Sequence, residues 1–130
     1  MAVLRSIIAL VGGFAILAFV WVVLVAVVAM VIGARAADQF SPTMIDAKIA
    51  LFAFAALAGG YATASLAPGR PRLHVIVLAA MVLAMTVSMI ASPQPGAPRW
   101  FPVALAVMGP ICAVLGGAFR RPRSSSPVPT

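Results

Sequence analysis

Few side chains in this sequence are of the types that carry out chemistry. It contains one histidine, one cysteine, two aspartates and no glutamate. Acid-base catalysis, nucleophilic catalysis and metal binding all need such groups held together in pairs or clusters. His74 and Cys112 each stand alone in an apolar run. We therefore predict no catalytic residue, no metal site and no cofactor, and we do not expect an enzyme.

The remaining polar groups have structural interpretations. His74 is predicted to be an interfacial polar residue, and a proton or ligand contact is the alternative. Cys112 is expected to behave as a small apolar residue. Four hydroxyl groups are expected to bond to their own helices or to neighbouring ones. They belong to Thr63, Ser65, Thr86 and Ser88.

The elements that carry these residues are predicted to be transmembrane helices. Hydrophobic residues make up 64% of the 130 residues and charged residues 8%, which indicates an integral membrane protein. A helix of about 20 apolar residues crosses the hydrocarbon core, and four segments meet this length. They are residues 3–32, 44–67, 73–92 and 100–119. Short connections rich in Pro and Gly predict an all-α, up-and-down four-helix bundle within residues 1–119.

The basic residues predict the orientation of these spans. Six arginines would lie on one side of the membrane, namely Arg5, Arg70, Arg72, Arg120, Arg121 and Arg123. Arg35, Lys48 and Arg99 would lie on the other side, together with Asp38 and Asp46. Because basic residues are retained in the cytoplasm, both termini are predicted to be cytoplasmic. Residues 120–130 are expected to form a disordered basic tail.

The first span is predicted to be an uncleaved anchor. Ala34-Arg35-Ala36 resembles a signal-peptide cleavage site, but signal peptides have apolar regions of about 7 to 15 residues, and this run is much longer. Its length of roughly 45 Å requires a tilt or an extension beyond the hydrocarbon, and it is expected to continue as helix toward Ala37. In the second span, Ser41 is predicted as the N-cap, with Pro42 in the first helical position and Asp46 favourably placed near the helix dipole.

Small residues recur every four positions in three of the spans, a pattern that lets helix backbones approach closely. The predicted packing residues are Ala56, Gly60 and Ala64 in the second span, Ala80, Ala84 and Ser88 in the third, and Gly109, Ala113 and Gly117 in the fourth. These stripes serve packing within the bundle, contacts in a homo-oligomer, or contacts with a larger partner. Pro110 predicts a kink in the fourth span.

Several short motifs suggest a family. Gly59-Gly60-Tyr61, Ala67-Pro68, Pro71 with His74, Trp100-Phe101-Pro102 and Gly116-Gly117 resemble those of small, uncharacterised four-span inner-membrane proteins of bacteria. The resemblance implies a location in the bacterial cytoplasmic (inner) membrane and a topology. It carries no activity, substrate or site residue.

Two functions remain open from the sequence. The first is a structural or accessory protein that acts through helix contacts with itself or a larger membrane protein. The second is an oligomeric transporter or channel for a small apolar or weakly polar solute, with Tyr61, Pro110 and the hydroxyl groups lining its path. Proton-coupled transport is disfavoured because the second, third and fourth spans lack an ionisable residue in their interiors. The lipid bilayer is the expected environment, and nucleic acid is not an expected partner.

Overall fold

The protein consists of four α-helices. The computed structural model describes residues 2–33, 39–67 and 69–120. The helices are α1 (Ala2–Ile32), α2 (Pro42–Leu66), α3 (Pro71–Ala91) and α4 (Trp100–Ala118). Each is long and apolar enough to cross a membrane, and the described ranges contain no strand. The predicted all-α fold with four membrane-spanning helices is confirmed.

The helix ends follow local sequence signals. Ser41 is the N-cap of α2, where its hydroxyl accepts a hydrogen bond from the Met44 amide at 3.4 Å, and Pro42 occupies the first turn. Pro71 begins α3 in the same way, because proline has the φ angle of a helix and needs no N–H acceptor there. As a result α2 and α3 each begin two residues earlier than their apolar runs suggested.

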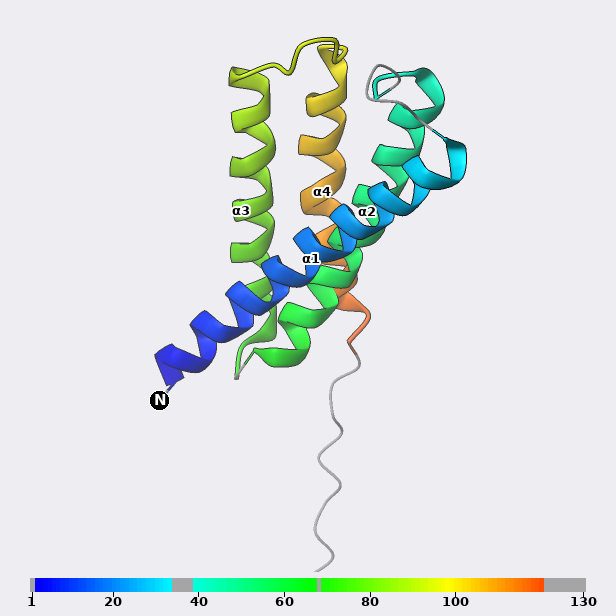
Figure 1. Ribbon diagram of the computed structural model, residues 1–130. Helices are drawn as coiled ribbons and strands as arrows, with labels where there is room; N and C mark the ends of the chain where they lie inside the picture. The colour runs from blue at the N-terminus through cyan, green and yellow to red at the C-terminus, as the bar shows by residue number, and fades with distance from the viewer. Residues whose placement is uncertain (1, 34–38, 68, 121–130) are drawn as a thin grey trace, which may run out of the picture.

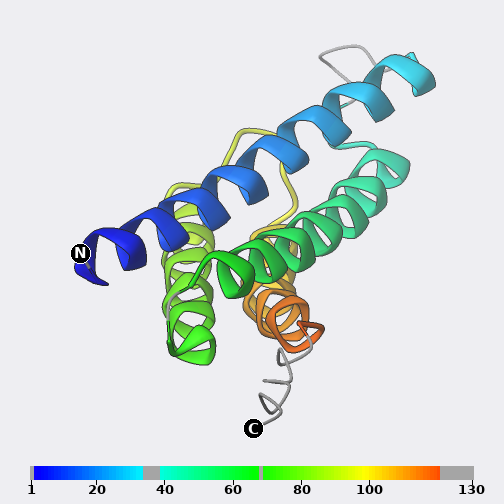
Figure 2. The ribbon, with the colours of Figure 1, turned by 90° about the horizontal axis from the view of Figure 1, so that it is seen from below.

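The order of neighbours in space is α1, α2, α4 and α3. Helix α2 packs against both α1 and α4, and α3 packs mainly against α4. Figure 1 shows α3 and α4 side by side, with α1 crossing obliquely in front of α2. The view from below in Figure 2 shows α1 as an outer layer over the other helices. Helix α1 also contacts α3, and α2 contacts α3, but less extensively than the three main pairs.

The oblique course of α1 agrees with its length. Its 31 residues extend about 46 Å at 1.5 Å per residue, which exceeds a hydrocarbon core of roughly 30 Å. The helix ends at Ile32, and Gly33 follows with a φ of +67°. This left-handed turn closes the helix before the expected extension toward Ala37; residues 34–38 lie outside the described residues.

Large apolar side chains fill the centre of the bundle. Phe52 of α2, Leu78 and Val82 of α3, and Leu105 of α4 are almost fully buried. Trp21 of α1 joins this core through an edge-to-face contact with Phe52, with 6.0 Å between ring centroids. Such aromatic pairs stabilise a core beyond simple burial.

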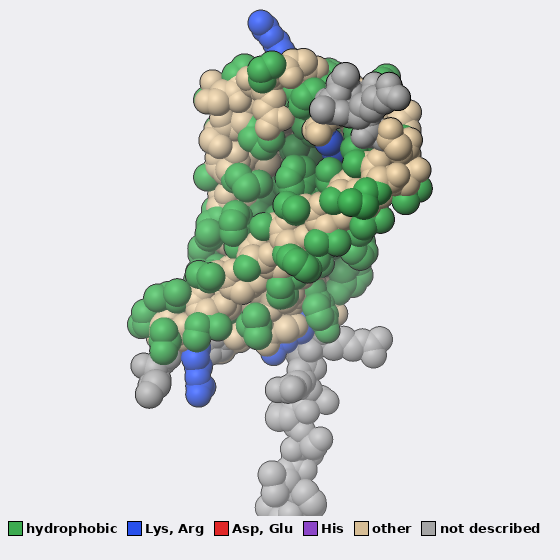
Figure 3. Space-filling view, in the orientation of Figure 1, with side chains coloured by type: hydrophobic (Ala, Val, Ile, Leu, Met, Phe, Trp, Pro, Cys, Tyr) green, Lys and Arg blue, Asp and Glu red, His purple; other side chains and the backbone are tan. Residues whose placement is uncertain are grey.

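The outer surface is also apolar. Figure 3 shows hydrophobic side chains over the middle of the visible face, with Lys and Arg side chains toward its two ends. A bilayer solvates this kind of surface, whereas in water contiguous apolar patches of this extent are rare. In Figure 1 the first turn of α1, the start of α3 and the ends of α2 and α4 lie at the lower end. These segments carry Arg5, Arg70, Arg72 and Arg120.

Candidate functional site: helix seams and an arginine-lined groove

The closest approach of one helix backbone to another is in the seam between α2 and α4. A Cβ atom added at Gly60 would lie 2.0 Å from the carbonyl oxygen of Ala113. One added at Gly116 would lie 2.1 Å from the carbonyl oxygen of Leu57. The two backbones therefore touch, and only glycine permits this approach. Of the predicted stripes, Ala56, Gly60 and Ala64 are buried in α2, and Ala113 is buried in α4.

The two glycines predicted as packing residues of α4 meet side chains, whereas Gly116 was not among the predicted packing residues. A Cβ atom at Gly109 would lie 2.8 Å from both Phe52 and Val82, and one at Gly117 would lie 2.6 Å from Val75. Side chains of both α2 and α3 therefore pack against Gly109. Gly117 sets the distance between α4 and the first turns of α3.

The seam between α1 and α2 was not predicted from the sequence. The buried residues of α1 are Ala9, Gly13 and Leu17, which recur every four positions. Gly13 leaves room for the side chain of Thr63, and Gly59 leaves room for Leu17. The signal that was available is the pairing of Gly12-Gly13 with Gly59-Gly60, which places a glycine pair in each helix.

The small-residue stripe of α3 lies on the surface, unlike those of α2 and α4. Ala80, Ala84 and Ser88 are all exposed, so they do not form the predicted packing stripe within this chain. The buried face of α3 is instead formed by larger residues, and it comprises His74, Val75, Leu78, Ala79, Val82 and Thr86. Gly109 and Gly117 of α4 provide the space for Val82 and Val75, and this complementarity turns the larger residues inward.

Most hydroxyl groups are used within their own helices. Thr86 donates to the carbonyl oxygens of Val82 and Leu83, each at 3.0 Å. Ser65 donates to Tyr61 and Ser88 donates to Met85 in the same manner. Thr86 is fully buried and Tyr61 is about half exposed, so these groups do not line a common path through the single chain.

Two buried polar atoms have no hydrogen-bond partner among the described residues. They are the hydroxyl oxygen of Thr63 and the indole nitrogen of Trp21. Thr63 lies in the contact between α1 and α2, where its side chain fits against Gly13. The role of Thr63 in this seam is therefore to fill space.

Lys48 is buried by the protein itself. Although it lies near the start of an apolar, membrane-spanning helix, Lys48 is only 8% exposed. Its ammonium group donates to the carbonyl oxygen of Gln39 at 2.8 Å and lies 4.7 Å from the centroid of the Phe40 ring. Phe40 in turn contacts Phe101 of α4, with 6.5 Å between centroids. Lys48 thus holds the entry to α2 against the bundle.

The remaining candidate polar residues have simple positions. His74 is buried, and its Nδ1–H donates to the carbonyl oxygen of Arg70 at 2.9 Å, which closes the first turn of α3. Asp46 is exposed in the second turn of α2, beyond the first turn in which the helix dipole acts strongly, so the predicted dipole interaction is weak. Cys112 is a half-buried free thiol. Within the described ranges no three His, Cys, Asp or Glu residues converge on a metal-binding position.

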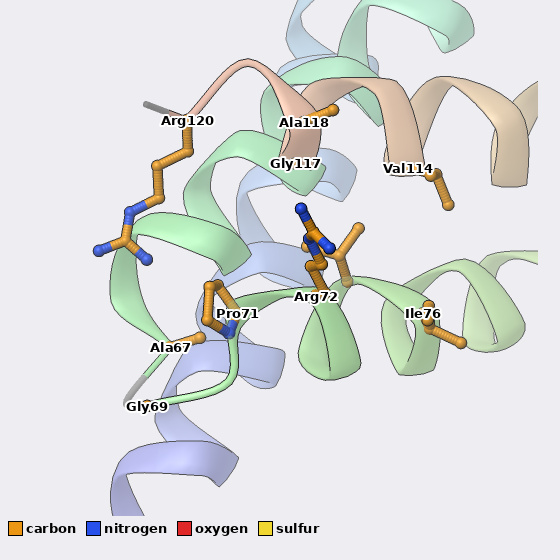
Figure 4. Close-up of a pocket in the computed structure, with 10 residues that line it drawn as sticks. Ala67, Gly69, Pro71, Arg72, Ile76, Val114, Gly117, Ala118 and Arg120 are labelled. Carbon is orange, nitrogen blue, oxygen red and sulfur yellow. The ribbon is translucent and has the colours of Figure 1, made fainter. Parts of the chain in front are cut away.

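A groove of about 750 Å³ opens at the lower end of the bundle, between the start of α3 and the end of α4. Val75, Ile76 and Val114 form its apolar part, and small residues such as Gly69 and Ala118 leave it open. Arg72 and Arg120 also line it. Figure 4 shows Arg72 pointing from α3 toward α4 near Gly117, and Arg120 turned toward the end of α2.

Arg120 links the ends of two helices. Its guanidinium group donates a hydrogen bond to the carbonyl oxygen of Ala64. This carbonyl belongs to the last turn of α2, where backbone acceptors lack partners within the helix, and a cation there also interacts favourably with the helix dipole. Arg120 thus has a structural role in addition to its predicted role in membrane topology.

Two further predictions concern Pro110 and the C-terminal tail. Helix α4 continues through Pro110, which removes the backbone donor to Ala106, and the kink stays a prediction. The basic tail was expected to begin at Arg120, but Arg120 packs on the bundle; residues 121–130 lie outside the described residues.

Comparison with protein-family models, with curated proteins and with solved structures finds no match. The features of the structure that could carry a function are the helix seams, the exposed stripe of α3 and the arginine-lined groove.

Proposed function

We propose that this protein is a small, non-enzymatic structural or accessory protein of the bacterial cytoplasmic membrane. It acts through a helix contact on the outer face of α3, with a second copy or with a helix of a larger membrane protein. The observation that carries the proposal is the exposure of Ala80, Ala84 and Ser88. The equivalent small residues of α2 and α4 largely pack in contacts within the bundle.

The chemistry of the α3 stripe suits a helix contact. Lipid tails are as apolar as leucine, so helices associate in a membrane through close packing rather than through hydrophobicity. Ala80 and Ala84 present only methyl groups, and the Ser88 hydroxyl is already bonded to Met85 at 2.6 Å. Exposed apolar side chains such as Val77 and Met81 flank these positions, so a partner helix meets a surface on which no polar group has to be satisfied.

The orientation of the protein belongs to the same proposal. The arginines at positions 5, 70, 72 and 120 belong to segments at the lower end of the bundle. Lys48 and Arg99 belong to segments at the other end. The positive-inside rule favours a cytoplasmic position for the lower end, and with it for both ends of the chain.

Transport by the single chain is less well supported. Phe52, Leu78, Val82 and Leu105 meet at the centre of the bundle and fill it. A solute would need a path formed between copies.

Native mass spectrometry of the full-length protein, extracted in a gentle detergent or in nanodiscs, tests the proposal. We expect either a defined homo-oligomer or a stoichiometric foreign membrane subunit. A protein that is monomeric and free of other subunits in both preparations would contradict the proposal.

The Ala84→Leu variant locates the contact. A leucine at this position would hold two helices apart, so we expect the oligomer or complex to be lost. Ala15→Leu is the matched control, because Ala15 is exposed on α1 and lies outside the stripe. Equal association of the two variants would show that the contact lies elsewhere.

A further inference from the structure

We infer that the groove between α3 and α4 binds one anionic phospholipid, with its phosphate held by Arg72, with Arg120 at the edge of the groove, and with its acyl chains along Ile76 and Val114. This inference needs only that the four helices span a membrane. It does not depend on the helix contact proposed for the outer face of α3.

The position of the groove matches the depth of lipid phosphates. It lies where α3 begins and α4 ends, at the lower end of the bundle. In a membrane-spanning helix pair this is the level at which the hydrocarbon core gives way to the headgroups. The groove volume of about 750 Å³ lies within the range of ligand sites in proteins.

The groove is amphipathic in the same direction as a lipid. Arg72 and Arg120 lie at its headgroup end, in the first turn of α3 and just beyond α4. Ile76 and Val114 lie about one turn deeper in their helices, and both are exposed. The contact of Gly117 with Val75 brings α3 and α4 together beside them, so an acyl chain can follow the seam toward the centre of the bilayer.

No acidic residue of the described ranges lies near the groove. The sequence contains only two acidic residues, Asp38 and Asp46. Asp46 lies near the start of α2, at the opposite end of the bundle. Arg72 also occupies the first turn of α3, where the helix dipole disfavours a cation. An anion at Arg72 relieves both conditions.

The donor geometry of Arg120 leaves capacity for this anion. A guanidinium group carries five N–H donors, and one described bond, to the Ala64 carbonyl, uses one nitrogen of Arg120. That bond fixes the side chain at the edge of the groove. Arginine binds phosphate oxygens through paired N–H groups, and basic pockets between transmembrane helices on the cytoplasmic side are sites for anionic headgroups.

The test is native mass spectrometry of the full chain released from vesicles of equal parts phosphatidylglycerol and phosphatidylcholine. We expect one bound phosphatidylglycerol per chain, in preference to phosphatidylcholine. Arg72→Gln should lower this preference about fivefold, the factor expected for one basic residue at the headgroup level. Ala118→Phe should lower it as well, because it fills the groove without a change of charge.

Arg5→Gln is the matched control, since it removes one positive charge at the same end but outside the groove. We expect it to keep the preference of the wild type. A loss equal to that of Arg72→Gln would show only diffuse attraction to the surface and would overturn the inference. So would full binding by Ala118→Phe, equal binding of phosphatidylcholine, or displacement of the lipid by millimolar inorganic phosphate.

Discussion

The seam between α2 and α4 makes a strong prediction for the Gly60→Ala variant. The added Cβ atom would lie 2.0 Å from the Ala113 carbonyl oxygen, whereas ordinary van der Waals contact begins at 3.4 Å. The two backbones would therefore have to move apart by about 1.4 Å. Neither side offers a flexible side chain that could rotate away.

The magnitude follows from this displacement. A radial gap of about 0.5 to 1 Å already removes a quarter to a half of a dispersion contact, and overpacked cores are destabilised by about 1 to 3 kcal/mol. Because both partners at Gly60 are backbone, we take the upper end of this range. Alanine has a better helix propensity than glycine by up to ~1 kcal/mol, which offsets part of the loss. We expect the free energy of unfolding to fall by about 2 kcal/mol.

The control is Gly12→Ala on α1. The nearest atom to its added Cβ is the terminal Cδ1 of Leu66 at 3.2 Å, and that side chain can move. Its free energy of unfolding should therefore equal that of the wild type or rise by up to ~1 kcal/mol, the gain in helix propensity. The two variants make the same chemical change in a helix, so the difference between them measures the backbone contact.

The assay is steric trapping or detergent-induced unfolding of the full chain in bicelles, with circular dichroism as a check on helix content. Gly116→Ala attacks the same seam, at 2.1 Å from the Leu57 carbonyl oxygen. A single separation of the helices relieves both clashes, so the double variant should lose clearly less than the sum of the single losses. If Gly60→Ala were as stable as Gly12→Ala, the backbone contact would not exist in the membrane.

Three further predictions concern side chains that the sequence did not single out for these roles. Thr63→Val keeps the shape of a buried side chain and removes a hydroxyl that has no described partner. The free energy of unfolding in the same bicelle assay should therefore stay unchanged or rise by up to about 1 kcal/mol. A clear loss would reveal a hydrogen bond of the Thr63 hydroxyl. Lys48→Met keeps the apolar stem but removes the donor to the Gln39 carbonyl, so hydrogen exchange at residues 39–48 should rise several-fold, while exchange in α3 stays constant. Arg120→Gln weakens the link to the Ala64 carbonyl, so the last turn of α2 should exchange faster than in Arg5→Gln, which serves as its charge control.

The predicted elements came from signals that are local in the sequence. Apolar runs of sufficient length fix the four helices because a bilayer leaves the backbone no other partners. Ser41 and Pro42 fix the start of α2 through capping chemistry alone. Gly60 and Ala113 belong to small-residue stripes whose spacing is also visible in the sequence. In each case the relevant interactions span a few residues.

The face of α3 that packs could not be predicted in the same way. A helix in lipid is apolar all round, so hydrophobic periodicity does not show which face is buried. The choice depends on where α4 offers space, and Gly109 and Gly117 offer it to Val82 and Val75. The bond from Arg120 to Ala64 joins positions 56 residues apart, and no local pattern indicates it. The groove likewise forms only where the start of α3 meets the end of α4, two segments that are far apart in the sequence.

The exposed faces of α1 and α3 explain why a partner helix is proposed at α3. The outer face of α1 carries large side chains such as Val11, Phe19 and Val22. Flexible lipid chains can fill the spaces between such side chains, so a protein partner gains little there. Ala80 and Ala84 on α3 allow a backbone to come close, and the packing gained depends on that distance. The regular spacing of the exposed Ala80, Ala84 and Ser88, and not the hydrophobicity of α3, is therefore the feature that favours a protein partner on this helix.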